Sequence, residues 1–146
     1  MAVDKFVIDA NILFSAVIRQ KGLYEELIDH YVFYSPDFAL LELQKYKQTI
    51  LKKTRADPAK LREFTIRLFQ GLIILPDFVI SEESIKKARE LCDDIDPKDV
   101  LYVALNEELQ TVLLTRDKVL HNGLQDKGYD RVKLFDDFVR EFTAQP

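Results

Sequence analysis

Short apolar runs recur along the chain and alternate with longer segments whose apolar residues return every three or four positions. Runs rich in branched and aromatic residues are typical of strands, whereas the longer spacing is typical of helices. Strands are therefore predicted at residues 5–8, 31–34, 72–75, 111–115 and 131–135. Helices are predicted at residues 12–19, 23–30, 36–53, 58–71, 82–92, 97–109, 118–127 and 136–142.

Several predicted helices begin with recognisable capping residues. Ser35, Asp57 and Asp96 each precede a proline, and a capping side chain followed by proline at the first helical position is a common helix start. The alternation of strands and helices predicts an α/β fold with a parallel sheet covered on both faces. No repeat, low-complexity tract or linker interrupts the pattern, so we expect one domain over residues 1–146.

Composition limits the class of protein. With 47% hydrophobic and 32% charged residues, the chain is typical of a globular protein. Cys92 is the only cysteine, which excludes an internal disulfide and a zinc site built from cysteines. The first apolar run ends at Asp9 after three residues, and no later run approaches the ~18 residues of a membrane span. We expect a cytoplasmic protein without a signal peptide or membrane segment.

Four acidic residues lie where apolar runs end or are interrupted. Asp9 follows the first strand, Glu42 lies inside the run 39–43, Asp99 precedes the run 100–105, and Asp117 follows the strand that ends near residue 115. Burial beside apolar sequence requires a partner for each carboxylate. Two like charges about 4 Å apart repel by roughly 4 kcal/mol at an effective dielectric of ~20, so a converged cluster would need a cation. The set of four therefore predicts a metal site.

Local structure offers an alternative explanation for three of these acids. Asp9 and Asp117 each precede a predicted helix and can cap it, and Asp96, Pro97 and Asp99 form a capping arrangement that needs no chemistry. Each position is ambiguous when taken alone, so the argument for a site depends on the whole set. Parallel sheets bind ligands beyond the carboxyl ends of their strands, where two of the acids fall.

A site made of carboxylate oxygens suits hard cations. Mg²⁺ and Mn²⁺ bind such oxygens, keep several waters and are completed by substrate phosphates. The chemistry that this donor set supports is hydrolysis of a phosphodiester by an activated water, with one or two metal ions. The net charge of −4 argues against a passive nucleic-acid coat, but it does not exclude an enzyme that acts on nucleic acid.

Basic residues near the acids are candidates for contacts to nucleic acid. The stretch 45–55 is the densest in lysine and arginine, and it predicts either a solvated helix face or a track for phosphates. Candidate nucleic-acid contacts are Arg19, Lys45, Lys98, Arg116 and Lys118. Tyr24, Tyr46 and Tyr102 are expected to pack in the core rather than to stack on bases.

Four short motifs occur in a set order over nearly the whole chain: Val7-Ile8-Asp9-Ala10-Asn11-Ile12-Leu13, Leu40-Leu41-Glu42-Leu43, Asp96-Pro97-Lys98-Asp99-Val100 and Leu114-Thr115-Arg116-Asp117. In this order the motifs resemble the PIN-domain family of nucleases, which includes the VapC-type toxins of toxin-antitoxin systems. The resemblance implies a three-layer α/β/α fold with a central, mainly parallel sheet. It also implies metal-dependent cleavage of single-stranded RNA, and the expected substrate partner is a single-stranded or structured RNA.

The resemblance assigns roles to individual positions. Asp9, Glu42, Asp99 and Asp117 become the metal-organising, catalytic carboxylates, with Mg²⁺ or Mn²⁺ as cofactor. Asn11 and Thr115 become supporting polar residues, and Asp96 becomes an optional fifth acid. Family members are often homodimers, and the toxins are held inactive by a small antitoxin. The compact Thr115-Arg116-Asp117 motif departs from many toxins, which leaves an RNA-processing role open.

Two other functions remain possible from the sequence. An aspartate at the end of a first strand is also a feature of HAD-like phosphotransferases, but their second aspartate, two residues further on, is Asn11 here. A non-catalytic module that binds RNA or protein is the other alternative. The presence of all four acids favours an enzyme over such a module.

Overall fold

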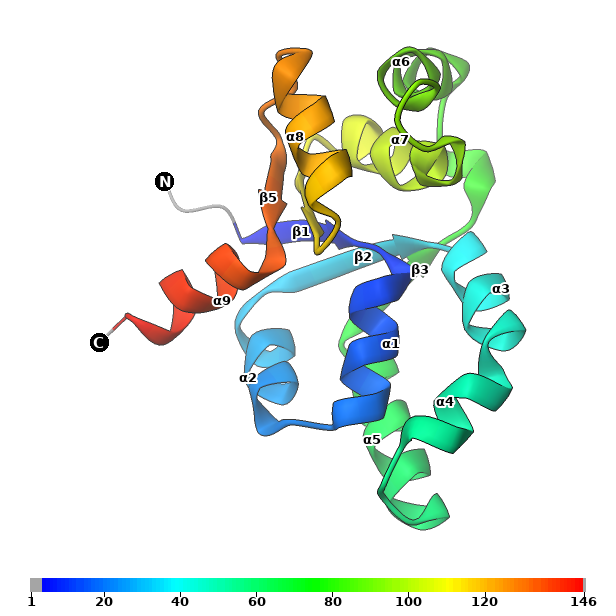
Figure 1. Cartoon of the computed structure of the whole chain (residues 1–146), viewed down its shortest axis with the longest axis vertical. Helices are drawn as coiled ribbons and strands as arrows, with labels where there is room; N and C mark the ends of the chain where they lie inside the picture. Colours follow the sequence, from blue (N-terminus) through cyan, green and yellow to red (C-terminus); the bar gives the residue numbers. More distant parts are fainter. Residues whose placement is uncertain (1–3, 146) are drawn as a thin grey trace.

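A five-stranded sheet forms the centre of the computed structural model, which describes residues 4–145 (Figure 1). The strands are β1 (Lys5–Ile8), β2 (Val32–Pro36), β3 (Leu72–Leu75), β4 (Val112–Thr115) and β5 (Val132–Leu134). Their order is β3-β2-β1-β4-β5, and every neighbouring pair is parallel. The structure thus confirms the predicted parallel sheet and the position of each predicted strand to within two residues.

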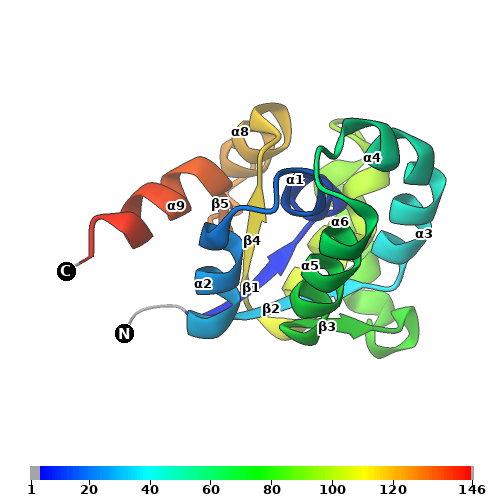
Figure 2. The ribbon, with the colours of Figure 1, turned by 90° about the horizontal axis from the view of Figure 1, so that it is seen from below.

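Helices cover both faces of this sheet. In Figure 1 the helices α1 (Ala10–Arg19), α2 (Gly22–His30), α5 (Pro58–Gln70) and α9 (Phe135–Thr143) lie on one side of the strands. The helices α6 (Glu82–Cys92), α7 (Val100–Leu109) and α8 (Lys118–Asp126) lie on the other side, and Figure 2 shows the same layers from below. Two short helices, α3 (Phe38–Lys45) and α4 (Lys47–Lys53), pack against α1. The predicted three-layer α/β/α architecture is confirmed.

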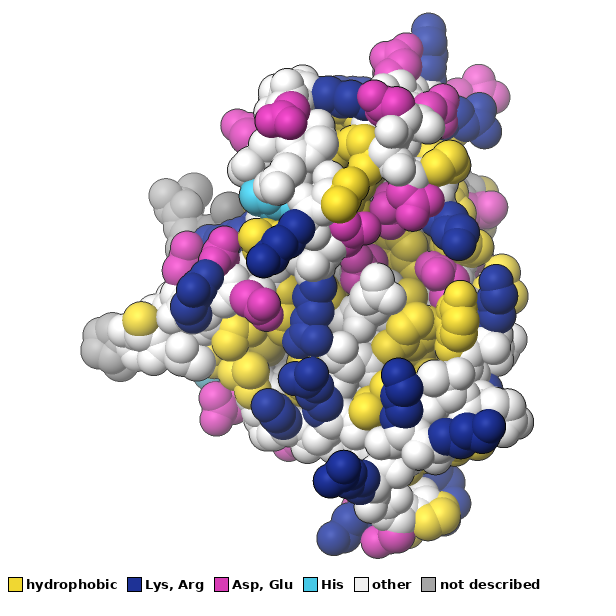
Figure 3. Space-filling model, viewed as in Figure 1, with side chains coloured by type: hydrophobic (Ala, Val, Ile, Leu, Met, Phe, Trp, Pro, Cys, Tyr) yellow, Lys and Arg dark blue, Asp and Glu magenta, His cyan; other side chains and the backbone are white. Residues whose placement is uncertain are grey.

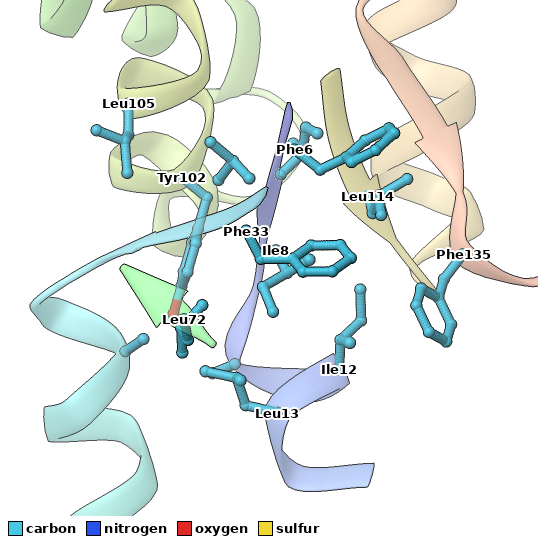
Figure 4. Close-up of a cluster of buried hydrophobic side chains, with 14 of the residues drawn as sticks. Phe6, Ile8, Ile12, Leu13, Phe33, Leu72, Tyr102, Leu105, Leu114 and Phe135 are labelled. Carbon is cyan, nitrogen blue, oxygen red and sulfur yellow. The ribbon is translucent and has the colours of Figure 1, made fainter. Parts of the chain in front are cut away.

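The core lies on both faces of the central strand. Figure 4 shows Ile8, Ile12, Leu13 and Phe33 packed together on the side of α1, and all four are less than 7% exposed. Burial of parallel strands on both faces explains why their sequences read as continuous apolar runs. Within residues 4–145, no helix is long and apolar enough to cross a membrane.

The register of the sheet brings distant acids to one edge. Ile8 of β1 pairs with Leu114 of β4, so Asp9 and Thr115 leave the sheet side by side although they lie 106 positions apart. Because the carboxyl ends of parallel strands share one edge, the segments that follow β1 and β4 form a common surface there.

The predicted helix start at Ser35 is wrong. Ser35 and Pro36 belong to β2 and pair with Ile74 and Leu75 of β3. Sheet pairing outweighs the capping pattern here because Ser35 is fully buried and its Oγ donates a hydrogen bond of 2.8 Å to the carbonyl of Ile8. The helix predicted from this start through residue 53 is also interrupted at Tyr46, which separates α3 from α4.

The predicted helix at 97–109 begins later than expected. Pro97–Asp99 forms a 3₁₀ turn, and the α-helix starts at Val100. Asp96 accepts a hydrogen bond of 3.0 Å from the backbone N–H of Lys98, so it caps this turn as predicted. A proline at the first position of a turn is compatible with either helical form because its missing N–H is unpaired in both.

Replacing Ser35 by alanine should lower the free energy of unfolding by about 1 kcal/mol, because the carbonyl of Ile8 would lose its buried donor. Urea denaturation measures this change. Thr143→Ala is a suitable control, since the Thr143 hydroxyl bonds to the carbonyl of Arg140 on the surface. Equal stability losses in the two variants would contradict an anchoring role for Ser35.

Candidate active site

A cavity of about 740 Å³ opens at the carboxyl edge of the sheet. Figure 3 shows acidic side chains gathered on this face, with hydrophobic side chains directly below them and lysine and arginine side chains further down. The acidic residues that line the cavity are Asp9, Glu42, Asp96, Asp99 and Asp117. All four acids of the predicted metal site, together with the optional fifth, therefore line the same cavity.

Asp9 both caps a helix and lies at the base of this cavity. Its Oδ1 accepts a hydrogen bond of 3.2 Å from the N–H of Ile12, and its Oδ2 accepts one of 3.0 Å from the hydroxyl of Thr115. Burial raises the pKa of Asp9 to about 6, and the nearby charges of Glu42 and Asp117 act in the same direction. The two hydrogen bonds offset part of this effect, so capping and a role in the site are compatible.

The side chain of Asp99 does not cap a helix, unlike that of Asp9. Asp99 precedes α7, yet its side chain makes no capping hydrogen bond. Its Oδ2 is buried and has no hydrogen-bond partner within residues 4–145. Burial raises the pKa of Asp99 to about 7, and the charges of the other four acids in the cavity add to this effect. Capping is therefore excluded as the reason for this carboxylate, and its free oxygen requires another explanation.

Glu42 and Asp117 are held by hydrogen bonds from opposite sides of the cavity. The hydroxyl of Tyr102 donates to Oε1 of Glu42 at 2.5 Å, which links α7 to α3. Burial and this hydrogen bond to a carboxylate raise the pKa of Tyr102, so it remains a donor. Asp117 caps α8, because its Oδ1 accepts from the N–H groups of Val119 at 2.9 Å and Leu120 at 3.1 Å.

The acids share a cavity but do not converge on a single point. Within residues 4–145, no group of three or more histidine, cysteine, aspartate or glutamate side chains is arranged to hold a metal ion. The expectation of a tightly converged cluster is therefore met only in part. Hydrogen bonds from protein donors hold three of the four carboxylates in their separate positions.

The predicted supporting residues lie at the same place. Thr115 is fully buried, and its hydroxyl also accepts a hydrogen bond of 3.1 Å from the N–H of Asp117. Thr115 thus connects Asp9 to Asp117. Asn11 is exposed and lines the cavity. Both positions fit the orienting role that the motifs imply, and that role remains a prediction.

Only some of the basic residues that were predicted to contact nucleic acid line this cavity. Lys98 and Arg116 line it, whereas Arg19, Lys45 and Lys118 do not. Of the basic residues in the stretch 45–55, Lys53 is the one that lines the cavity. That stretch is therefore mainly a solvated helix face with a single member at the site.

The surroundings of Arg116 were not predicted. Its guanidinium donates to the hydroxyl of Ser15 at 2.8 Å and to that of Tyr24 at 3.2 Å, and it lies 5.1 Å from the centre of the Phe135 ring. The Nε of Arg116 is buried without a hydrogen-bond partner in residues 4–145. These contacts fix the position of a positive charge next to the acids. They join segments about 100 positions apart, which no local sequence pattern reveals.

Comparison with known proteins agrees with this arrangement. The sequence profile of the PIN domain matches residues 7–135, which covers most of the chain. The chain belongs to the PIN-domain family. The matched region contains all five acids of the cavity, and the resemblance predicted from the four motifs is confirmed. No curated protein sequence matches this PIN domain significantly.

Solved structures share the fold at low sequence identity. PAE2754 from Pyrobaculum aerophilum is 15% identical, with a TM-score of 0.65 over 99% of this chain and 100% of that one. VapBC2 from Rickettsia felis, crystallised with a DNA fragment from its promoter, is 16% identical, with a TM-score of 0.57 over 89% of this chain and 96% of that one. At such identities the likeness establishes the PIN fold and does not transfer a substrate.

Proposed function

We propose that this PIN domain is a metal-dependent endoribonuclease that hydrolyses phosphodiester bonds in single-stranded RNA. The observation that carries the proposal is Asp99, which lines a cavity with four other acids and whose buried Oδ2 has no hydrogen-bond partner in the described residues. A buried carboxylate oxygen without a donor is costly unless a cation compensates it.

The donor set fits a hard divalent cation. The cavity offers carboxylate oxygens, and histidine and cysteine are absent from its lining, which suits Mg²⁺ or Mn²⁺ better than zinc. Asp9, Glu42, Asp99 and Asp117 are the residues that would hold the ion. When bound, such an ion supplies positive charge that stabilises the attacking and leaving oxygens of an in-line displacement.

The remaining side chains position these acids and the substrate. The Thr115 hydroxyl orients Asp9, and the Tyr102 hydroxyl orients Glu42. Lys98 and Arg116 border the acids and offer positive charge to phosphates on either side of the cleaved bond. Membership of the PIN family favours this nuclease over the HAD-like alternative. The remaining alternative, a non-catalytic binding module, is separated from it by an activity assay.

The proposal predicts Mn²⁺-dependent cleavage of a labelled single-stranded RNA that stops when EDTA is added in excess. Matched single-stranded DNA and duplex RNA should be cleaved at least about 10-fold more slowly. Gel analysis of the fragments measures the rates and shows whether cleavage is internal. Cleavage that survives chelation would contradict a metal-dependent mechanism. Metal binding by calorimetry without any cleavage would favour the non-catalytic module.

The proposal has further parts, which concern the biological role, the location, the assembly and the domain organisation of the protein. The fold likeness to the VapBC2 complex favours a role as the toxin of a toxin-antitoxin pair, neutralised by a small antitoxin. We also propose a cytoplasmic homodimer and a single domain over residues 1–146. Light scattering tests the dimer. Growth arrest on expression of the wild-type chain, relieved in an Asp9→Asn variant, tests the toxin role.

A further inference from the structure

The cavity extends away from the acids as a channel between two helices. Its lining residues on each side recur at intervals of one and three positions, so each set lies along one helix face. The α1 residues are Ala10, Asn11, Phe14, Ser15 and Ile18, and the opposite set consists of Tyr46, just before α4, with Thr49, Ile50 and Lys53 of α4. From its first to its last lining residue, the α1 face is about 12 Å long, given a rise of 1.5 Å per residue.

The chemistry of the channel changes along its length. The end near the start of α1 carries the acids, the middle is apolar with Phe14 and Ile18 facing Tyr46 and Ile50, and the far part carries Lys53. Figure 3 shows the same succession on this face, with hydrophobic side chains between the acidic group and the lower basic side chains. These parts would match the chemistry of a nucleotide strand. The acids would suit a metal-bound phosphate, the apolar middle a planar group, and Lys53 a second phosphate.

Tyr46 is the aromatic side chain available for such a planar group. It is 40% exposed, whereas Tyr24 and Tyr102 are at most 6% exposed and their hydroxyls are engaged by Arg116 and Glu42. The structure thus corrects the expectation that all three tyrosines pack in the core. Tyr46 occupies the break between α3 and α4, in a stretch whose neighbouring residues are also exposed.

The ring of Tyr46 is held in place from two sides. Phe14 meets it edge to face, with ring centres 5.4 Å apart, and the Nζ of Lys45 lies 5.6 Å from the centre of the ring. The Nζ of Lys45 lies over the ring, yet 40% of Tyr46 remains exposed, and Lys45 is itself an exposed side chain that a stacked base can displace. An exposed aromatic ring of this kind is a platform on which unpaired bases stack.

We propose that a base of the RNA substrate stacks on Tyr46 in the apolar part of this channel, while Lys53 contacts a phosphate of the same strand. This inference rests on the proposed nuclease function and adds a subsite to it. The occupant is a nucleotide rather than a peptide segment, because the cation that the acids would hold at one end and Lys53 at the other would each suit a phosphate. The total volume of about 740 Å³ lies in the range of small-ligand cavities.

Abasic RNA provides the sharpest test. Single-stranded RNA oligomers are prepared with one nucleotide at a time replaced by an abasic nucleotide, and kcat/KM is measured for each. Tyr46→Ala should lower kcat/KM on intact RNA by roughly 5-fold or more. It should have no further effect on the oligomer that lacks the stacked base. Tyr46→Phe should stay within about 2-fold of the wild type, since it keeps the ring.

Leu41→Ala is the matched control, because Leu41 is 63% exposed on α3 and does not line the channel. It should leave all rates unchanged. Equal losses for Tyr46→Ala on intact and abasic RNA would overturn the proposal, since they would indicate a structural role. Full RNA cleavage by Tyr46→Ala, combined with lost binding of a protein inhibitor, would also overturn it and assign the channel to a protein partner.

A binding measurement separates this inference from the proposed hydrolysis. RNA that contains 2-aminopurine loses fluorescence when that base stacks on an aromatic ring, and the signal does not require cleavage. Quenching by the wild-type protein that disappears in Tyr46→Ala supports the subsite even if no RNA is hydrolysed. Undiminished quenching in Tyr46→Ala would overturn the subsite even if hydrolysis is observed.

Discussion

Asp99→Asn should abolish RNA cleavage, with a loss of about 100-fold or more in kcat, while the metal-free protein becomes more stable. The activity loss is expected because the buried carboxylate would no longer offer a charged oxygen to the cation. The gain in stability is expected because the amide removes a desolvated charge that the other acids of the cavity repel. Few substitutions of a merely structural aspartate change activity and stability in opposite directions.

Two measurements check this result. Initial cleavage rates with Mn²⁺ give the activity, and thermal unfolding in EDTA gives the stability. Asp126→Asn is the control, since Asp126 is exposed at the end of α8 and outside the cavity. An Asp99→Asn protein that is less stable than the wild type would contradict the repulsion between Asp99 and the other acids. If it also kept its activity, it would contradict the proposed role of Asp99 in holding the metal.

The metal-free protein should lose stability as the pH rises from about 4 to 7. The pKa of Asp9 is about 6 and that of Asp99 about 7 in the folded protein, against an ordinary value of 3.8. The folded state therefore holds protons that the unfolded state has already released, and raising the pH through this window favours unfolding. For Asp9 alone, a pKa difference of about 2 corresponds to on the order of 3 kcal/mol.

Mn²⁺ should reverse this trend. An ion that binds only the folded state stabilises it by about 2.7 kcal/mol at 100 times its dissociation constant, and charged carboxylates bind it best. The Mn²⁺-induced rise in Tm should therefore be larger at pH 7.5 than at pH 5.5. Urea denaturation across the pH range, with EDTA or Mn²⁺, measures both effects. Constant or increasing stability of the metal-free protein from pH 4 to 7 would refute the pKa assignments.

The sequence predicted the fold well because the central strands β1 and β4 are largely buried on both faces and therefore form apolar runs. The same reasoning failed at Ser35, where a hydroxyl and a proline imitate a helix start. The outcome there depends on pairing between Pro36 of β2 and Leu75 of β3, which are far apart in the chain. Local propensity cannot predict a strand end that is fixed by its neighbour in the sheet.

The sequence predicted which residues form the candidate site, but it did not predict how their side chains are arranged. Asp9 and Asp117 were found because they follow strands, and parallel strands deliver their carboxyl ends to one edge. The sequence did not distinguish the three tyrosines, because their exposure depends on which helix faces meet in the folded chain. The partner of Glu42 is Tyr102, and that contact exists only after α7 and α3 have met.

The hydrogen bond between Thr115 and Asp9 joins two ends of a central strand pair whose sequences are separated by most of the chain. During synthesis, β1 emerges from the ribosome long before β4. Asp9 therefore has no hydrogen bond from Thr115 until residues 115–117 have also been synthesised. Under the proposed nuclease function, no competent site would therefore exist until the last quarter of the chain is made. The topology of the sheet would then delay activity on RNA until translation is nearly complete.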